Sequence, residues 1–201
     1  DRMVMLASAR IVLADHRGSL AEQIGRRQLD THAPPFEPTR VDRVPALPIP
    51  APAPPELQLR NPHGGFSTDG REYVVVSGAG DVTPAPWANV LANPHFGTVI
   101  SESGGAYTWG ENAHEFRLTP WHNDPVVDGS GEAIYLRDEE TGALWSPTPL
   151  PCRGSGSYVT RHGFGYSVFE HDEDGIHSEL WIYVALDASV KFSVLKLRND
   201  S

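Results

Sequence analysis

The sequence has a single cysteine, Cys152, which excludes an internal disulfide bond and fits a reducing compartment. It has no apolar run of about 18 residues, the length that a membrane-spanning helix needs. Its N-terminus lacks the basic, apolar and small-residue pattern of a signal peptide. Because the chain starts with Asp1 rather than Met, we expect it to be a fragment of a longer protein, and the fragment itself to be soluble.

Lysine and arginine are scarce in the larger part of the chain. Residues 61–201 contain eight Lys and Arg against 19 Asp and Glu, a net charge of −11, whereas residues 1–60 carry +1. This acidity argues against nucleic acid and anionic lipid as partners, because phosphate groups are bound by clustered Lys and Arg. Neutral ligands remain open. The length of 201 residues fits one domain, or one domain plus an arm.

Residues 1–30 are interpreted as the end of a preceding segment. Within them, residues 3–14 form an apolar run that is typical of a buried strand or a short helix. Ser19 and Glu22 have the spacing of a capping box, which predicts a short helix over about residues 20–28. One run and one helix cannot bury their own apolar face, so they belong with an element elsewhere. A peripheral helix on the main domain is the alternative.

Residues 31–56 are predicted to be a linker. The stretch 34–55 holds nine of the 18 prolines. Proline fixes φ and lacks the amide donor, which favours an extended, polyproline-like spacer. A ligand for an SH3-type domain is the other interpretation, but the flanking basic residues that would support it are not at the right places.

Residues 57–201 predict an all-β fold, an antiparallel β-sandwich. Seventeen of the 18 aromatic residues lie after residue 60, and no helical periodicity of useful length follows it. Glycine closes the turn signals Thr68-Asp69-Gly70, Glu140-Thr141-Gly142 and Asp174-Gly175, where a positive φ suits a hairpin. The expected strands are 72–76, 98–101, 106–109, 115–118, 133–137, 158–160, 165–171, 177–185 and 190–197.

The stretch 101–121 combines two Trp, one Tyr and one Phe with Gly, Ser, Asn, Thr and Arg. Tyr107, Trp109 and Trp121 are candidate platforms, because aromatic rings stack on the C–H faces of sugars. The mixture of aromatic, hydroxyl, amide and guanidinium groups suits a neutral polyol. It equally suits a sandwich end that docks on another domain, and the rings could also belong to an inter-sheet core.

Several motifs of the sandwich region resemble a known family. They are Trp87-Ala88-Asn89, Asn93-Pro94-His95-Phe96-Gly97, Tyr107-Thr108-Trp109, Arg117-Leu118-Thr119-Pro120-Trp121, Tyr135-Leu136-Arg137-Asp138 and Trp145-Ser146-Pro147-Thr148. The chain resembles the N-terminal β-sandwich of the cellobiose phosphorylase family, glycoside hydrolase family 94, formerly glycosyltransferase family 36. Within it, the chain is most similar to the region of cyclic β-1,2-glucan synthases that carries this sandwich. The resemblance covers about residues 7–199.

This resemblance implies a galactose-mutarotase-like supersandwich, followed in the family by a linker helix and an (α/α)6 barrel. The barrel carries the acid that protonates the leaving oxygen and most of the phosphate site. Inorganic phosphate is therefore expected as a co-substrate of the parent enzyme, with no cofactor. We assign no catalytic residue to this chain and expect it to lack phosphorylase activity by itself.

The resemblance also implies partners and a location. The expected partners are a β-glucan oligosaccharide, the catalytic barrel of the parent and, in a homodimer, a second copy. Arg117, Asn123 and Asp124 are candidates for hydrogen bonds to sugar hydroxyls at the rim of the barrel, and an Arg–Asp pair that holds a loop is the alternative. The parent is expected on the cytoplasmic side of the bacterial inner membrane, as part of a larger membrane protein.

The chain departs from the family pattern in two loops. It has Asn61-Pro62-His63-Gly64-Gly65 where the family shows Asn-Gly-Leu-Gly-Gly, so the glycine pair that a tight strand entry needs is kept. In residues 111–116 the family more often shows a basic, an acidic and an Asn residue. Contacts of these two loops are the part of the resemblance that does not carry over.

Metal and nucleotide sites are not predicted. His171 and His177 flank an acidic turn, but charged hairpin tips are common and a single cysteine cannot build a structural zinc site. Asp124, Asp128 and Glu132 miss the spacing of an EF-hand. The glycines in residues 78–80 precede no helix, which excludes a dinucleotide loop. The sequence also lacks a nucleophile elbow and carboxylates that converge across a cleft.

Together these features predict a carbohydrate-active sandwich domain of a β-glucan-processing glycosyltransferase or phosphorylase, most like a cyclic β-1,2-glucan synthase. One alternative is a free-standing, non-catalytic module that binds carbohydrate or another protein. Another is a fragment of a cellobiose- or chitobiose-type phosphorylase.

Overall fold

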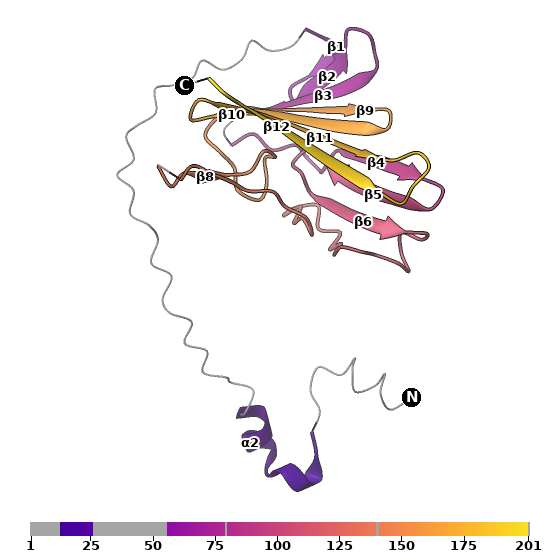
Figure 1. Cartoon of the computed structure of the whole chain (residues 1–201), viewed down its shortest axis with the longest axis vertical. Coiled ribbons are helices and arrows are strands. Elements are labelled where there is room, and N and C mark those ends of the chain that lie inside the picture. The colour runs from indigo at the N-terminus through magenta and orange to yellow at the C-terminus, as the bar shows by residue number, and fades with distance from the viewer. Residues whose placement is uncertain (1–12, 26–55, 79, 140, 201) are drawn as a thin grey trace. The chain divides into compact units, whose positions relative to one another are not determined.

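The computed structural model of the chain describes residues 13–25, 56–78, 80–139 and 141–200 (Figure 1). Most of the apolar run over residues 3–14, the end of the helix expected over 20–28, and nearly all of the linker over 31–56 lie outside the described residues. No helix of the described ranges is long and apolar enough to cross a membrane.

The N-terminal unit contains a 3-10 turn, η1 (Asp15–Arg17), and a short helix, α2 (Leu20–Gly25). The capping box predicted for this helix is confirmed. The Ser19 N–H donates to Glu22 Oε2 at 2.7 Å, and the Glu22 N–H donates to Ser19 Oγ at 3.4 Å. The two residues thus satisfy each other's backbone donors at the start of the helix.

The larger unit is built from strands. The seven-stranded sheet has the order β1-β2-β3-β9-β10-β11-β12, and every neighbouring pair in it is antiparallel. Its strands are β1 (Leu57–Asn61), β2 (Gly64–Ser67), β3 (Glu72–Ser77), β9 (Tyr158–Gly163), β10 (Tyr166–Glu173), β11 (Ile176–Val184) and β12 (Lys191–Asn199).

A three-stranded antiparallel sheet has the order β4-β5-β6. Its strands are β4 (Ala88–Asn93), β5 (Phe96–Ser101) and β6 (Ala106–Gly110), and a two-stranded ribbon joins β7 (Leu136–Arg137) to β8 (Leu144–Trp145). The three-stranded sheet packs on one face of the seven-stranded sheet. Their shared core contains Leu91, Phe96, Ile100 and Ala106 from the small sheet and Phe169, Leu180, Ile182 and Val184 from the large one.

The predicted fold class, an antiparallel all-β sandwich, is therefore confirmed. The turn predictions hold as well, because Gly70, Gly142 and Gly175 have φ values of 71°, 70° and 79°. Seven of the nine expected strands correspond to β3, β5, β6 and β9–β12. The strand expected over 133–137 shrinks to the two residues of β7.

The strand expected over 115–118 is wrong. These residues form a loop, and their strand-type pairing with β6 is limited to an isolated bridge between Trp109 and Arg117. Side-chain alternation alone could not reveal this, because a strand also needs a neighbour to pair with over several residues. Strands β1, β2, β4 and β8 were not expected from the sequence.

The glycine pair of the first hairpin is explained by close backbone packing. A Cβ atom on Gly64 would lie 1.9 Å from the Val74 carbonyl oxygen, and one on Gly65 would lie 2.7 Å from the Gln58 carbonyl oxygen. Only glycine fits between β1 and β3 at these positions.

Candidate functional site

Tyr107 and Trp109 lie on the outer side of the three-stranded sheet, away from the shared core. They alternate along β6 with Ala106 and Thr108, and Ala106 belongs to the core. Side chains two residues apart on a strand point to the same face, so both rings project to the opposite side. Tyr107 stands opposite Val99, and Trp109 opposite Gly97.

Trp121 joins these two rings from a later loop. Its ring centroid lies 4.7 Å from that of Tyr107, and the Tyr107 and Trp109 centroids are 5.3 Å apart. Tyr107 is buried, with 9% of its surface exposed, while both tryptophans are partly exposed. We call Tyr107, Trp109 and Trp121 the aromatic face. The three rings are not part of the inter-sheet core cluster, and they pack on one another and on Gly97 of β5.

Arg117 borders the aromatic face through its backbone bridge to Trp109. Its side chain is exposed, and its Nε donates to the Ala113 carbonyl oxygen at 3.3 Å. Within the described part of the chain it forms no ion pair with Asp124. The guanidinium group therefore does not hold the following loop in the way that an Arg–Asp pair would.

Asn123 and Asp124 are exposed and belong to a turn. Asn123 has a φ of 49°, and Asp124 Oδ1 accepts from the Val126 N–H at 2.9 Å and from the Val127 N–H at 3.1 Å. These two backbone hydrogen bonds lower the pKa of the Asp124 carboxyl. Asp124 thus fixes the turn that follows Trp121, and its other carboxylate oxygen makes no hydrogen bond to a described residue.

The carboxylates considered as calcium ligands, those of Asp124, Asp128 and Glu132, each bond to different partners. Asp128 accepts hydrogen bonds from Ser101 and Ser103, and Glu132 Oε2 pairs with Lys191 Nζ at 2.5 Å. Among the described residues, no three or more His, Cys, Asp or Glu side chains are arranged to hold a metal ion.

The two histidines beside the acidic turn have structural contacts. His171 is buried and stacks on Tyr158 with 3.7 Å between the ring centroids, and His177 Nδ1 lies 2.7 Å from Asp172 Oδ1. The glycine-rich residues 154–156 wrap the Glu173 carboxylate, which accepts from the Ser155 N–H at 2.7 Å and the Gly156 N–H at 3.2 Å. These residues therefore tie a loop to β10.

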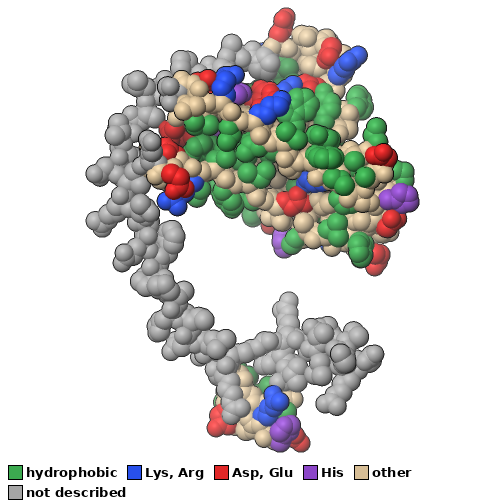
Figure 2. Space-filling model, viewed as in Figure 1, with side chains coloured by type: hydrophobic (Ala, Val, Ile, Leu, Met, Phe, Trp, Pro, Cys, Tyr) green, Lys and Arg blue, Asp and Glu red, His purple; other side chains and the backbone are tan. Residues whose placement is uncertain are grey.

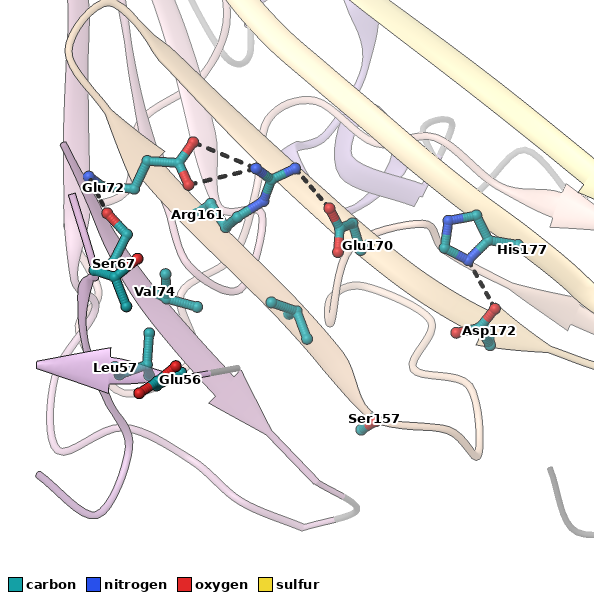
Figure 3. A pocket seen from close by; sticks show the side chains of 12 residues that line it. Glu56, Leu57, Ser67, Glu72, Val74, Ser157, Arg161, Glu170, Asp172 and His177 are labelled. Carbon is teal, nitrogen blue, oxygen red and sulfur yellow. Dashed lines mark hydrogen bonds and ion pairs between the residues drawn. The ribbon is translucent and has the colours of Figure 1, made fainter. Parts of the chain in front are cut away.

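A groove of about 410 Å³ lies on the other face of the seven-stranded sheet, under the β1–β2 hairpin (Figure 3). Arg161 lies at its centre, where Nη2 donates to Glu170 Oε1 at 2.6 Å and Nη1 donates to both Glu72 carboxylate oxygens at 3.4 Å. Together with the His177–Asp172 contact, this arrangement gives three of the carboxylates that line the groove a side-chain partner.

Beside the groove, aromatic rings follow one another across β10, β11 and β12. Tyr166 stacks on Trp181 with centroids 5.4 Å apart, and Tyr183 stacks on Phe192 at 5.0 Å. Arg161 and Lys196 both lie over the Trp181 ring, at 5.9 and 5.4 Å. This surface was not predicted from the sequence, although the alternation in β11 places Trp181 and Tyr183 on one face.

The comparisons with known proteins point to one family. Residues 71–201 match the family model described as Glycosyl hydrolase 94, supersandwich domain. The cyclic beta-(1,2)-glucan synthase NdvB of Rhizobium meliloti is 42% identical over 147 residues, which are 73% of this chain and 5% of the relative. The N,N'-diacetylchitobiose phosphorylase of Vibrio proteolyticus is 36% identical over 143 residues, 69% of this chain and 18% of the relative.

A more distant relative is the solabiose phosphorylase of Paenibacillus borealis, 29% identical over 146 residues, which are 69% of this chain and 18% of that protein. The chain thus spans between 5% and 18% of the length of these three relatives.

Proposed function

This chain belongs to the glycosyl hydrolase 94 family through its supersandwich domain, and we propose that it is the sandwich of a cyclic β-1,2-glucan synthase. In this proposal the domain scaffolds and borders the sugar site of an (α/α)6 catalytic barrel. The observation that carries it is the 42% identity to the Rhizobium meliloti synthase over 73% of the chain.

The aromatic face supports a role at a sugar site. Its three rings lie outside the inter-sheet core, and both tryptophans are partly exposed. Tryptophan rings pair well with the C–H faces of sugars, and Arg117 and Asp124 beside them offer a donor and an acceptor for hydroxyl groups. The net charge of −11 over residues 61–201 also favours a neutral glycan over a phosphorylated ligand.

In this proposal the sandwich binds the sugar and supports the barrel, and the barrel catalyses the reaction. The barrel would supply the acid that protonates the leaving oxygen, with inorganic phosphate as the co-substrate and no organic cofactor. The whole enzyme would lie at the cytoplasmic side of the bacterial inner membrane as part of a larger membrane protein.

A second candidate is the sandwich of a disaccharide phosphorylase. It is favoured by the 36% identity to the chitobiose phosphorylase of Vibrio proteolyticus, over 69% of this chain. The two candidates differ in the sugar that the aromatic face would bind. This sugar is a β-1,2-linked glucan for the synthase and N,N'-diacetylchitobiose for the phosphorylase. A free-standing binding module would use the same face without a barrel.

The test is the affinity of the purified chain for β-1,2-linked gluco-oligosaccharides and for N,N'-diacetylchitobiose, measured by NMR titration. We expect the glucan to bind more tightly, and Trp121→Ala to weaken binding about tenfold, about 1.4 kcal/mol. Trp181→Ala is the matched control, because Trp181 lies on the seven-stranded sheet. Equal affinity for both sugars, or unchanged affinity with a lower melting temperature in Trp121→Ala, would contradict the proposal.

A further inference from the structure

Trp109 and Trp121 lie on opposite sides of the Tyr107 ring. Trp109 pairs with Arg117 through an isolated antiparallel bridge, and the residues that follow Arg117 remain hydrogen-bonded to β6. Counted from this bridge, the chain runs back along β6 and brings Trp121 level with Gly105. The order of the rings along β6 is therefore Trp109, Tyr107 and Trp121.

Each indole ring contacts Tyr107 and not the other indole. The centroids of Tyr107 and Trp109 are 5.3 Å apart with their planes at 37°, and those of Tyr107 and Trp121 are 4.7 Å apart with their planes at 33°. Among the described residues, no ring contact joins Trp109 directly to Trp121. Tyr107 is buried, whereas both indoles are partly exposed. The aromatic face thus offers two separate exposed rings with a buried ring between them.

The backbone of β5 determines which side of Trp109 can bind a ligand. A Cβ atom on Gly97 would lie 2.4 Å from Trp109 Cζ2 and 2.8 Å from its Cε2, so the indole lies directly on the glycine. One face of the ring is occupied by the sheet, and the opposite face remains for a ligand. A ring that is fixed in this way can stack on the C–H face of one sugar residue.

Each indole has a polar side chain nearby that can bond to a hydroxyl group. Arg117 is paired with Trp109 in the bridge, so both side chains leave the same face of the chain. Its Nε donates to the Ala113 carbonyl oxygen at 3.3 Å, and its two Nη groups donate to no described residue. Asp124 follows Trp121, and the turn uses one of its carboxylate oxygens. A donor near one ring and an acceptor near the other suit a ligand with hydroxyl groups along its length.

The aromatic rings of the seven-stranded sheet differ from this arrangement. Figure 2 shows hydrophobic side chains gathered over the region of β11 and β12. There Tyr166 stacks on Trp181, and Lys196 Nζ lies 5.4 Å from the centroid of the same indole. Tyr183 stacks on Phe192 in the same way. These rings already contact one another or a cation of the chain, so the outward face of Trp109 has no counterpart among them.

We propose that the aromatic face binds a neutral glycan of at least two sugar residues, with one residue stacked on Trp109 and another on Trp121. This inference rests on the proposed function and specifies its ligand as an oligosaccharide. A single sugar covers one of the two indoles, because the Tyr107 ring separates them. A glycan chain covers both indoles and brings hydroxyl groups to Arg117 and Asp124.

The two indoles should act together on one glycan chain. The second sugar residue belongs to a molecule that is already held, so its stacking adds affinity without a second loss of translational freedom. Stacking on one aromatic ring is worth up to about tenfold in affinity. We therefore expect β-1,2-linked glucotriose to bind about tenfold more tightly than glucose.

The test is an NMR titration of the purified chain with glucose and with β-1,2-linked glucotriose, read from the amides of β6 and of residues 119–124. Trp109→Ala and Trp121→Ala should each remove the tenfold difference, while glucose should still bind to the remaining indole. This retained glucose binding also shows that the variant is folded. Phe164→Ala is the matched control, because this ring is 91% exposed between β9 and β10, and it should keep the difference.

The outcomes separate this inference from the proposed function. Equal affinity of the native chain for glucose and glucotriose would overturn the inference and leave the proposed function standing. A preference for glucotriose that persists in Trp109→Ala would also overturn it, because Trp121 would then suffice. If no gluco-oligosaccharide binds to the native chain, both are overturned. Trp109→Leu, which keeps an apolar side chain on Gly97 without an aromatic ring, gives the same test if Trp109→Ala does not fold.

Discussion

The indole ring of Trp109 lies across Gly97, where a Cβ atom would come within 2.4 Å of Trp109 Cζ2 and 2.9 Å of the Ala92 side chain. Glycine thus provides the flat floor on which one ring of the aromatic face rests. The aromatic face therefore depends on the absence of a side chain at Gly97 in β5 as much as on the rings of Tyr107 and Trp109 in β6.

Replacing Gly97 by alanine should therefore displace the ring. We expect Gly97→Ala to reduce the free energy of unfolding by about 1–3 kcal/mol, as overpacking of a filled site does. The tryptophan fluorescence and any sugar affinity should change with it. Gly129→Ala is the control, because its Cβ would meet only Val127, at 4.0 Å. Equal urea midpoints of unfolding for Gly97→Ala and Gly129→Ala would contradict this prediction, because Trp109 would then move without loss of stability.

The ion pair between Lys191 and Glu132 is the second feature open to a direct test. Nζ and Oε2 are 2.5 Å apart, and the side chains are 11% and 26% exposed. Lys191→Met leaves a largely buried carboxylate without its cation, which should cost about 3–5 kcal/mol. The double variant Lys191→Met/Glu132→Gln should recover much of this loss, because the amide can still accept from Thr119, 2.9 Å away in the native chain. A double-mutant cycle in urea measures the coupling, and additive effects would contradict it.

The strands of the fold that could be predicted are those with regular alternation. Residues 177–185 and 190–197 alternate clearly, and they correspond to β11 and β12. β2 begins with Gly64 and Gly65, which have low strand propensity and are there because β1 and β3 approach too closely for a side chain. That reason exists only in the folded structure, so a reading of the sequence could not supply it.

The candidate site was predictable to a similar extent. Tyr107 and Trp109 are two residues apart on a strand, so the sequence places them on one face. The packing of the Trp121 ring against Tyr107 depends on the path of the loop between them. A strand was expected in this loop over residues 115–118, and the structure has none there. The Asp124 turn is local and typical of an Asp-Pro sequence, whereas the missing Arg117–Asp124 pair is a tertiary outcome.

His162 should make the stability of the domain depend on pH between about 6.5 and 4. Burial lowers its pKa to about 4, while the contact of its Nε2 with the Trp87 carbonyl oxygen, 3.0 Å away, raises it slightly. In this range the unfolded chain binds a proton that the folded chain does not, so stability is lost as the pH falls. The slope reaches at most about 1.4 kcal/mol per pH unit.

The measurement for His162 is urea unfolding at several pH values in this window. His162→Gln should flatten the curve, and His114→Gln should not, because the His114 side chain is 80% exposed. A wild-type curve that is already flat between pH 6.5 and 4 would contradict the assignment.

Glu173 should make the stability of the domain depend on pH in a lower range. Burial raises the pKa of its carboxyl, but His171, 3.2 Å away, and the N–H groups of Ser155 and Gly156 lower it more, to about 2. A depressed carboxyl pKa stabilises the fold above the unfolded value of about 4.3, and this contribution is lost as the pH falls from there to about 2. Glu173→Gln should lower stability at neutral pH, because the carboxylate that accepts these bonds is gone, and should also remove the acid-dependent loss. Asp124→Asn, on an exposed turn, is the control that should leave most of that loss in place. If the Gln variant kept the full slope of the wild type between pH 4.3 and 2, the loop over residues 154–156 would have to be held by other contacts.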